Sequence, residues 1–365
     1  MARYAGRNWT RAELAAWVGD PMQIAGARGC VLTDGKADGV RAVEVNTGAG
    51  LTFTVLPGRG MDIALAMFKG RALSFFSGTG ITSPSYYEEP GFGFLRSFYA
   101  GLLTTCGITQ SGAPTTDEGK PYGLHGRIAN SAAENLSIDQ DWEGEEYVIR
   151  LKGTMRETAA MGENLALTRR IEARLGVPAL RIHDTIANRG FSPQPIPLLY
   201  HFNFGFPLLA AGARVVAPIV KTVPRDEEAR KDRGVEECLV FPEPIPDYQE
   251  KVFFHTLAGD AAGRTFVALL NRDAGEGQPL GIVIRWSLKE LPLLCHWKMP
   301  HKGFYVQGLE PCMAPPMGRG ALRPKGELPM LEGQATHDVT IDVEVVDTEK
   351  QLDAIEAEAK KTAKK

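Results

Sequence analysis

The sequence contains few cysteines and no cysteine motif. Its five cysteines are widely spaced and include no C-x-x-C pair: Cys30, Cys106, Cys238, Cys295 and Cys312. This spacing indicates neither a disulfide framework nor a zinc site made of paired thiolates. We therefore expect a protein of the reducing cytoplasm.

The sequence also has no excess of one charge and no long apolar run. Among 365 residues, 41 Lys and Arg stand against 44 Asp and Glu, a net charge of -3, so a nucleic-acid partner is not expected. The most apolar stretch, residues 198–211, is interrupted by His201 and Asn203. The first residues have no apolar core of a secretory signal, so we expect neither a leader nor a membrane partner.

Common catalytic and nucleotide-binding motifs are absent. The sequence has no G-x-x-x-x-G-K-[ST], and no G-x-G-x-x-G lies between a strand and a helix. G-x-S-x-G and H-E-x-x-H do not occur either. Nucleotide-binding, seryl hydrolase and zinc peptidase activities thus lose their main sequence support.

Short runs in which β-branched and aromatic residues alternate with polar ones dominate the chain from residue 41 onward. There are ten such runs: RAVEV, LTFTV, EYVIRLKG, ALTRRIEARL, LRIHDTIAN, ARVVAPIV, KVFFHTL, RTFVALLN, GIVIRWSL and DVTIDVEVV. No segments of helical period alternate with them. The pattern predicts an all-β, mainly antiparallel protein, with 40 Gly and 24 Pro marking turns between the strands.

Helices are expected only at the ends of the chain. Thr10 and Glu13 form a capping box that predicts a helix over residues 11–18. Strand signals continue to residue 347 without a linker, so we expect one sandwich domain over residues 1–347. Residues 348–365 form a charged tail that is either a frayed helix or, the preferred interpretation, disordered.

Four histidines and one glutamate stand in apolar segments bordered by loops: His125, His201, His296, His301 and Glu310. A buried carboxylate costs several kcal/mol unless it is paired or hydrogen-bonded, so its placement suggests a function. One carboxylate with neutral imidazoles suits general acid and general base catalysis. Asp62 is a possible second carboxylate for glycoside hydrolysis, but it is equally well explained as a turn residue.

Three segments stand out together and in this order: GLHGRIAN with His125 and Arg127, LRIHDTIANRGFSPQPIPLLYHFNFGF with His201, and YVQGLEP with Glu310. They resemble segments of the aldose 1-epimerase (galactose mutarotase-like) superfamily, especially of its aldose 1-epimerase-like branch. LPGRGMDI, with Arg59, is similar to an early segment that contacts the sugar. The resemblance covers residues 50 to 320 and implies a large antiparallel β-supersandwich.

The resemblance also implies an activity and roles for residues. Glu310 would remove the proton of the anomeric hydroxyl and His201 would protonate the ring oxygen, so that α and β anomers of a sugar exchange without a cofactor. Among the residues expected to bind the sugar are His125, Arg127 and Arg59. Four further residues, which the resemblance does not itself supply, are also expected to bind the sugar: Asn203, His296, Lys298 and His301.

Several alternatives stay open. Arg127 with Lys298, Lys302 or Arg59 could face an anionic sugar instead of solvent. The four histidines named above and Glu310 could bind a divalent metal, which would favour a lyase or isomerase acting on an oxidised sugar. A carbohydrate-binding protein without catalysis is a third reading. The protein could be a monomer, or a homodimer formed through a sheet edge.

Overall fold

Two large antiparallel sheets make up most of the protein. The computed structural model describes residues 1–364. The larger sheet has 11 strands, and β7 (Arg71–Ala72) pairs with β6 outside the main path. The order across it is β20 (Ile219–Pro224), β21 (Lys251–Leu257), β24 (Leu293–His301), β25 (Phe304–Cys312), β18 (Leu199–Phe204), β10 (Leu103–Cys106), β6 (Asp62–Phe68), β5 (Leu51–Leu56), β4 (Arg41–Asn46) and β3 (Gly26–Val31).

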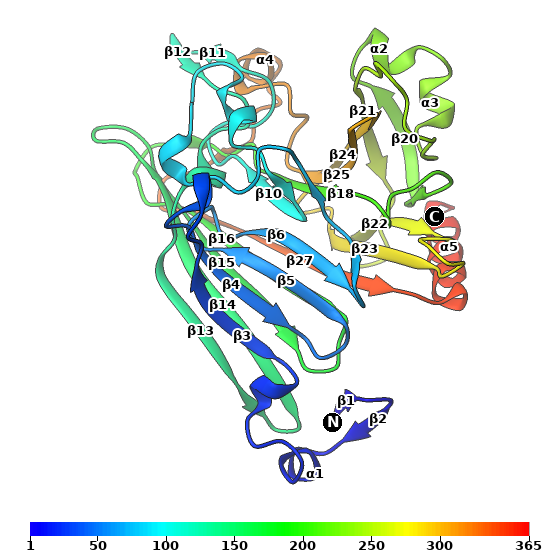
Figure 1. Cartoon of the computed structure of the whole chain (residues 1–365). Helices are drawn as coiled ribbons and strands as arrows, with labels where there is room; N and C mark the ends of the chain where they lie inside the picture. The colour runs from blue at the N-terminus through cyan, green and yellow to red at the C-terminus, as the bar shows by residue number, and fades with distance from the viewer. Residues whose placement is uncertain (365) are drawn as a thin grey trace.

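The second sheet has eight strands and packs against the first (Figure 1). Its order is β13 (Glu134–Glu143), β14 (Glu146–Thr158), β15 (Asn164–Arg174), β16 (Ala179–Asn188), β27 (Thr336–Val346), β23 (Leu280–Ser287), β22 (Arg264–Asn271) and β19 (Arg214–Val216). Each of the ten predicted runs contributes to a strand of one of these sheets. The predicted antiparallel supersandwich is therefore confirmed.

Smaller elements surround the two sheets. Four two-stranded pairs are β1 (Ala2–Tyr4) with β2 (Arg7–Trp9), β8 (Phe75–Phe76) with β9 (Ala100–Gly101), β11 (Thr115–Asp117) with β12 (Lys120–Tyr122), and β17 (Gln194–Pro195) with β26 (Met330–Leu331). The short α-helices are α1 (Arg11–Ala15), α2 (Glu227–Arg230), α3 (Gly234–Glu237) and α4 (Arg319–Leu322). Single 3-10 turns cover Pro21–Gln23, Gly35–Ala37, Pro84–Tyr86, Gly93–Arg96, Ile128–Asn130 and Arg323–Lys325.

The alternation of side chains along the strands explains the layers. In β16 every second residue is buried, because one face of the second sheet packs on the core and the other faces outward. In β18 all six residues are buried, so this strand is covered on both faces. Its even-numbered side chains, Tyr200, Phe202 and Phe204, pack in the core between the sheets. Its odd-numbered side chains therefore point to the opposite face.

The two terminal helices differ from their predictions. The capping box at Thr10 is present, but α1 ends at Ala15, three residues earlier than expected. The preferred interpretation of the C-terminal segment as disordered was wrong: α5 (Glu349–Ala363) is a helix whose Leu352, Ile355 and Ala359 pack on β22 and β23. Within residues 1–364, no helix is both long and apolar enough to cross a membrane.

A buried charge network joins the two sheets. Arg169 of β15 donates to both carboxylate oxygens of Asp184 on β16, at 2.9 Å and 2.7 Å. It also donates to Oδ1 of Asp62 on β6 at 3.0 Å. Tyr200 of β18 donates to Asp184 Oδ2 at 2.7 Å, and Thr105 of β10 donates to Asp62. Asp62 is therefore an internal partner of Arg169, not a turn residue and not a partner of Glu310.

We expect Arg169→Met to destabilise the protein by about 3–5 kcal/mol, because it leaves two buried carboxylates without their cation. Chemical denaturation followed by circular dichroism measures the change in the free energy of unfolding. Arg181→Met is the matched control, since Arg181 pairs with Asp342 at an exposed site and is expected to matter by less than about 1 kcal/mol. Equal losses in both variants would contradict the importance of the buried network.

Candidate functional site

A pocket of about 620 Å³ lies on the face of the larger sheet that points away from the second sheet. Its floor is formed by β18, β24 and β25, which contribute His201, Cys295, Trp297 and Glu310. These are the side chains that alternate with core residues such as Tyr200, Leu294 and Leu309. Strand periodicity alone therefore directs them to the pocket face.

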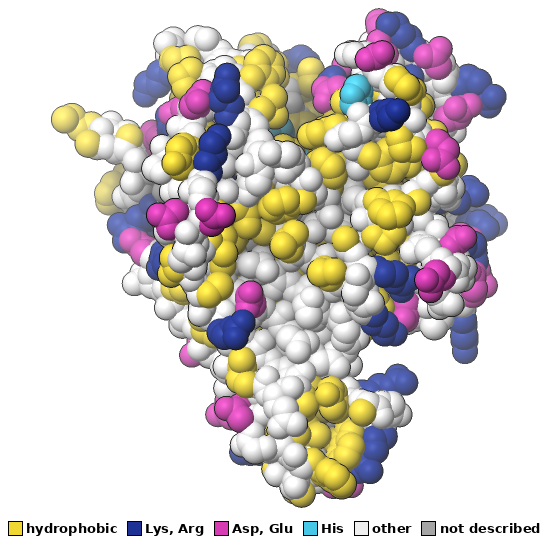
Figure 2. Space-filling model, in the orientation of Figure 1, with side chains coloured by type: hydrophobic (Ala, Val, Ile, Leu, Met, Phe, Trp, Pro, Cys, Tyr) yellow, Lys and Arg dark blue, Asp and Glu magenta, His cyan; other side chains and the backbone are white. Residues whose placement is uncertain are grey.

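Loops from distant parts of the sequence form the walls of this pocket. One wall contains Phe92, Phe94, Leu95 and Phe98, and another contains Leu124 with His125 and the segment Pro316–Met317. Arg225, Asp226, Glu250 and Val252 form the opposite side. In Figure 1 the loops around β11, β12 and α4 rise on one side of β18 and β25, and α2 and α3 rise on the other. Figure 2 shows a hollow in the surface between these two parts.

His201 and Glu310 meet at the floor of the pocket. The pairs Leu199 with Cys312 and Phe202 with Leu309 set the register between β18 and β25, and this register places His201 opposite Glu310. Nε2 of His201 lies 3.3 Å from Oε1 of Glu310. Both side chains are almost completely buried, although each contributes to the lining of the pocket.

A glycine makes room for the glutamate. Gly308 precedes Glu310 by two residues and shares its face of β25, and a Cβ atom at position 308 would lie 2.4 Å from Oε1 of Glu310. The indole ring of Trp297 packs beside both residues, 5.4 Å from the His201 ring between centroids. Glycine at this position thus lets the carboxyl group occupy the space next to the tryptophan.

Burial changes the proton affinity of both groups in opposite directions. Desolvation raises the pKa of Glu310 to about 8, and the charge of Glu250 adds to that rise. Desolvation also lowers the pKa of His201 well below its usual value, with a smaller contribution from His125. At neutral pH the pair is therefore uncharged, with a protonated Glu310 carboxyl group and a neutral His201 ring whose Nε2 lies 3.3 Å from Oε1. The pair thus carries one proton more than a carboxylate with a neutral imidazole.

Several buried polar atoms at or next to the His201 and Glu310 pair have no hydrogen-bond partner. Among the described residues, Oε1 of Glu310, Nδ1 of His201 and Oδ1 of Asn203 are buried without a hydrogen-bond partner. Buried polar groups are nearly always paired in native proteins, and each exception asks for an explanation. A polar ligand that enters the pocket would supply partners for the atoms that face it.

His125 is held with a defined tautomer at the pocket wall. Its Nδ1 accepts a hydrogen bond from the backbone N–H of Gly112 at 3.3 Å, so in the neutral ring Nε2 carries the proton. Burial lowers the pKa of His125 to about 4, which keeps the ring neutral. The following Gly126 has φ of 72°, and a Cβ there would lie 2.5 Å from the carbonyl oxygen of Gln110. The His-Gly step thus needs glycine to fit the tight loop that presents the ring.

Three of the sequence-predicted residues line the pocket, namely Glu310, His201 and His125. The other two residues from the resembling segments lie elsewhere. Arg59 is buried and donates to the carbonyl oxygens of Thr82, Ser97 and Ala129, so it braces loops instead of facing the pocket. Arg127 forms ion pairs with Glu89 and Glu163 near the surface.

The remaining predicted sugar contacts are also engaged within the protein. Asn203 is buried two residues after His201 on β18 and donates to the His201 carbonyl oxygen at 2.8 Å. Lys298 points to the other face of the sheet and donates to the carbonyl oxygens of Glu237 and Val240. His296 contacts His255 on that same face, and His301 lies 3.3 Å from the carbonyl oxygen of Tyr248. None of these four residues belongs to the pocket lining within residues 1–364.

The hypothesis of a metal bound by four histidines and Glu310 is not supported by these positions. His125, His201 and Glu310 share the pocket, whereas His296 and His301 lie outside its lining. The group in residues 1–364 that could hold a metal ion consists instead of Cys238, His255 and His296. His296 belongs to this second group because side chains alternate along β24, so that His296 points to the face opposite Cys295 and Trp297.

Sequence reasoning missed the charged wall of the pocket. Arg225 pairs with Asp226 and with Glu250, and Glu250 accepts a hydrogen bond from the indole Nε1 of Trp297 at 2.8 Å. Phe98, which packs 5.4 Å from the His201 ring, was missed as well. Each comes from a loop or a strand end with no local motif, so only the three-dimensional structure brings them to the site.

Comparisons with known proteins agree with this fold. A structure of a presumed aldose 1-epimerase from Klebsiella pneumoniae subsp. pneumoniae is 25% identical, with a TM-score of 0.87 over 94% of this chain and 90% of that one. A galactose mutarotase-like protein from Clostridium acetobutylicum is 13% identical, with a TM-score of 0.61 over 89% and 100% of the two chains. For a galactose 1-epimerase from Lactobacillus acidophilus the identity is 13% and the TM-score 0.56, over 88% and 99%.

The protein therefore has the galactose mutarotase-like fold. Residues 37–345 match the family model described as Domain of unknown function (DUF4432), and the chain belongs to that family. None of the curated proteins matches it. The fold class implied by the sequence resemblance is thus confirmed.

The raised pKa of Glu310 can be measured directly. In protein labelled with ¹³C at glutamate side chains, we expect one carboxyl resonance to titrate at about pH 8, because burial disfavours the charged form. The signal should disappear in Glu310→Gln. Titration of the Glu310 resonance near the usual glutamate value of about 4.3 would contradict a dry, apolar environment around the carboxyl group.

Proposed function

We propose that the protein is an aldose 1-epimerase that interconverts the α and β anomers of a sugar. The observation that carries the proposal is the pair of His201 and Glu310, 3.3 Å apart, at the floor of a partly apolar pocket. Anomer exchange needs one proton removed and one proton supplied within a few ångströms, and this pair offers both groups on neighbouring strands.

The reaction can be written with the protons balanced. The Glu310 carboxylate takes the proton of the anomeric hydroxyl, and protonated His201 gives its proton to the ring oxygen. The bond between C1 and the ring oxygen breaks and the open-chain aldehyde forms. Rotation about C1–C2 and return of both protons closes the ring on the other face. No electrons leave the sugar, and no additional reactant is consumed.

The opposite pKa shifts fit this cycle. A carboxylate whose conjugate acid has a raised pKa is a stronger base, and an imidazolium with a lowered pKa is a stronger acid. The working form consists of a Glu310 carboxylate and a His201 imidazolium. The form that dominates at neutral pH, a protonated Glu310 with a neutral His201, has the same total number of protons. Moving that proton from Glu310 to His201 therefore prepares the site without exchange with solvent.

The walls of the pocket suit a sugar. Phe98 and Trp297 offer aromatic faces or edges next to His201, against which C–H surfaces of a pyranose can pack. The neutral His125 supplies an N–H donor from Nε2, and Arg225 with Glu250 supplies a donor and an acceptor on the opposite side. Such a mixture of apolar surface and a few placed polar groups is typical of small-molecule sites.

We expect Glu310→Gln and His201→Asn to remain folded and to lower the rate of anomer exchange by about 10²- to 10⁴-fold each. The rate is measured by NMR exchange spectroscopy between α and β signals of neutral, phosphorylated and acidic sugars. Glu332→Gln serves as the control, because Glu332 is exposed and lies outside the pocket lining. Retention of the wild-type rate in either pocket variant would refute the assignment.

The rate is also expected to depend on pH in a particular way. Between the lowered pKa of His201 and the pKa of Glu310 at about 8, the pair holds one proton and the fraction in the working form is constant. Above about pH 8 the pair loses this proton, no acid remains for the ring oxygen, and the rate falls. The profile of kcat/KM, corrected for spontaneous exchange, tests this. A rate that climbs through pH 8 would show that His201 acts without an extra proton.

A further inference from the structure

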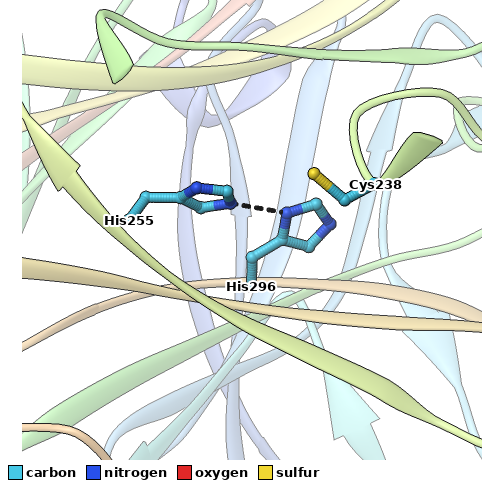
Figure 3. Close-up of side chains that lie close together, drawn as sticks. All are labelled: Cys238, His255 and His296. Atoms are coloured by element: carbon cyan, nitrogen blue, oxygen red, sulfur yellow. Dashed lines mark hydrogen bonds between the residues drawn. The ribbon is translucent and has the colours of Figure 1, made fainter. Parts of the chain in front are cut away.

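A second cluster of reactive side chains lies on the face of the larger sheet opposite the pocket. His255 of β21 and His296 of β24 point to this face, and Cys238, directly after α3, covers them (Figure 3). One ligand atom from each of the three residues lies within 4.8 Å of the others. All three side chains are buried, with exposed fractions of 2% or less.

One nitrogen of each imidazole ring lies close to a nitrogen of the other ring. Nε2 of His255 lies 2.9 Å from Nδ1 of His296. Two nitrogens bound to one tetrahedral zinc ion, at bond lengths of about 2.0–2.1 Å, are separated by about 3.3 Å. The present separation of the two nitrogens is therefore a few tenths of an ångström shorter than the separation of two nitrogen ligands on zinc. Burial keeps both rings uncharged, because it lowers the pKa of His255 to about 4 and that of His296 well below its usual range.

The outer nitrogens of both rings have polar neighbours. Nδ1 of His255 lies 2.9 Å from the hydroxyl of Thr222 on β20. Nε2 of His296 and Oε1 of Gln307 are both buried without a hydrogen-bond partner among the described residues, and the Gln307 side chain opposes the lowering of the His296 pKa. Metal-binding histidines usually donate their second N–H to such a group, which fixes the tautomer that binds the metal.

The buried environment of the cysteine disfavours its thiolate form unless a cation binds beside it. Burial raises the pKa of Cys238 to about 11, while the charge of Lys298 opposes that rise. A thiolate and two imidazoles are borderline to soft ligands and suit zinc better than calcium or magnesium. On binding, the thiol proton leaves to solvent and the sulfur takes the metal.

From this geometry we propose that Cys238, His255 and His296 form a zinc site that fastens the α2 and α3 segment to the sheet. Three protein ligands leave one tetrahedral position for a water molecule. The segment is held there by two buried lysines as well: Lys251 donates to the carbonyl oxygen of Lys231, and Lys298 to those of Glu237 and Val240. A zinc ion would add a third anchor. This inference does not depend on the proposed epimerase activity.

The site has a consequence for the pocket on the other face. The segment that Cys238 would anchor begins with Arg225 and Asp226, which line the pocket wall. Zinc binding at the far end of this segment would restrict its movement and so stabilise the wall. The ion itself lies behind the sheet, because His296 points away from the neighbouring pocket residues Cys295 and Trp297.

The experiment uses the full chain without an affinity tag, refolded with zinc and then dialysed against metal-free buffer. We expect one zinc ion per chain by elemental mass spectrometry, and its loss in Cys238→Ser and His255→Gln. Cys30→Ser is the matched control, since Cys30 lies outside this cluster and should leave the zinc content unchanged. Zinc content near zero in the wild type, or equal content in all variants, would overturn the proposal.

Two further measurements keep the test decisive if a ligand variant fails to fold. Cobalt(II) bound to wild-type protein should give intense visible absorption of a four-coordinate site and a thiolate charge-transfer band in the near ultraviolet. Thr222→Val keeps all three ligands and should weaken zinc binding by about 10- to 100-fold, as the loss of an outer hydrogen bond usually does. A cobalt spectrum without the thiolate band, or unchanged zinc affinity in Thr222→Val, would contradict the site as described.

Discussion

The position of the candidate site depends on one buried guanidinium group. Arg169 binds Asp184 within its own sheet and Asp62 on the other sheet, and Asp184 in turn accepts a hydrogen bond from Tyr200. Two charged carboxylates cannot stay in the core without this cation, so the sheets have one favourable alignment. Because Tyr200 is fixed in the core, the next residue, His201, must point to the opposite face of β18. The network thus aims the histidine at the pocket without touching it.

The same alternation gives the larger sheet two chemically different faces. On β24, Cys295 and Trp297 face the pocket, while His296 and Lys298 face the α2 and α3 segment. The sequence HWK therefore serves two sites although its residues are consecutive. Sequence reasoning placed His296 and Lys298 in the sugar site with Glu310 because proximity along a chain was taken for proximity in space. In a strand, neighbours in sequence are the residues that are held apart.

Strands and the central residues of the pocket could be predicted from the sequence for clear physical reasons. The strand runs carry their own periodicity, and Glu310 and His201 stand out because a polar group within an apolar strand needs a partner. Arg59 gave a misleading signal, since an arginine that binds three backbone carbonyl oxygens has the same sequence appearance as one that binds a ligand. Phe98 and Arg225 gave no signal, because their role arises only when distant loops meet over the sheet. The C-terminal helix was misjudged because three small or aliphatic residues, Leu352, Ile355 and Ala359, suffice to dock it.

Burial is the physical agent that links the fold to the chemistry proposed for it. The aromatic walls and the covered strand β18 remove water from around His201 and Glu310, and the loss of solvation disfavours a charge on either. An exposed pair would sit at neutral pH as a carboxylate and a mostly neutral imidazole, with no proton to give. In the buried pair the carboxyl group retains a proton until about pH 8, so the proton required by the acid is stored on the base. In the proposed reaction, a bound sugar places its anomeric hydroxyl and its ring oxygen next to the two groups. Its hydrogen bonds would stabilise the carboxylate and the imidazolium, so that the proton moves from Glu310 to His201 only when substrate is present.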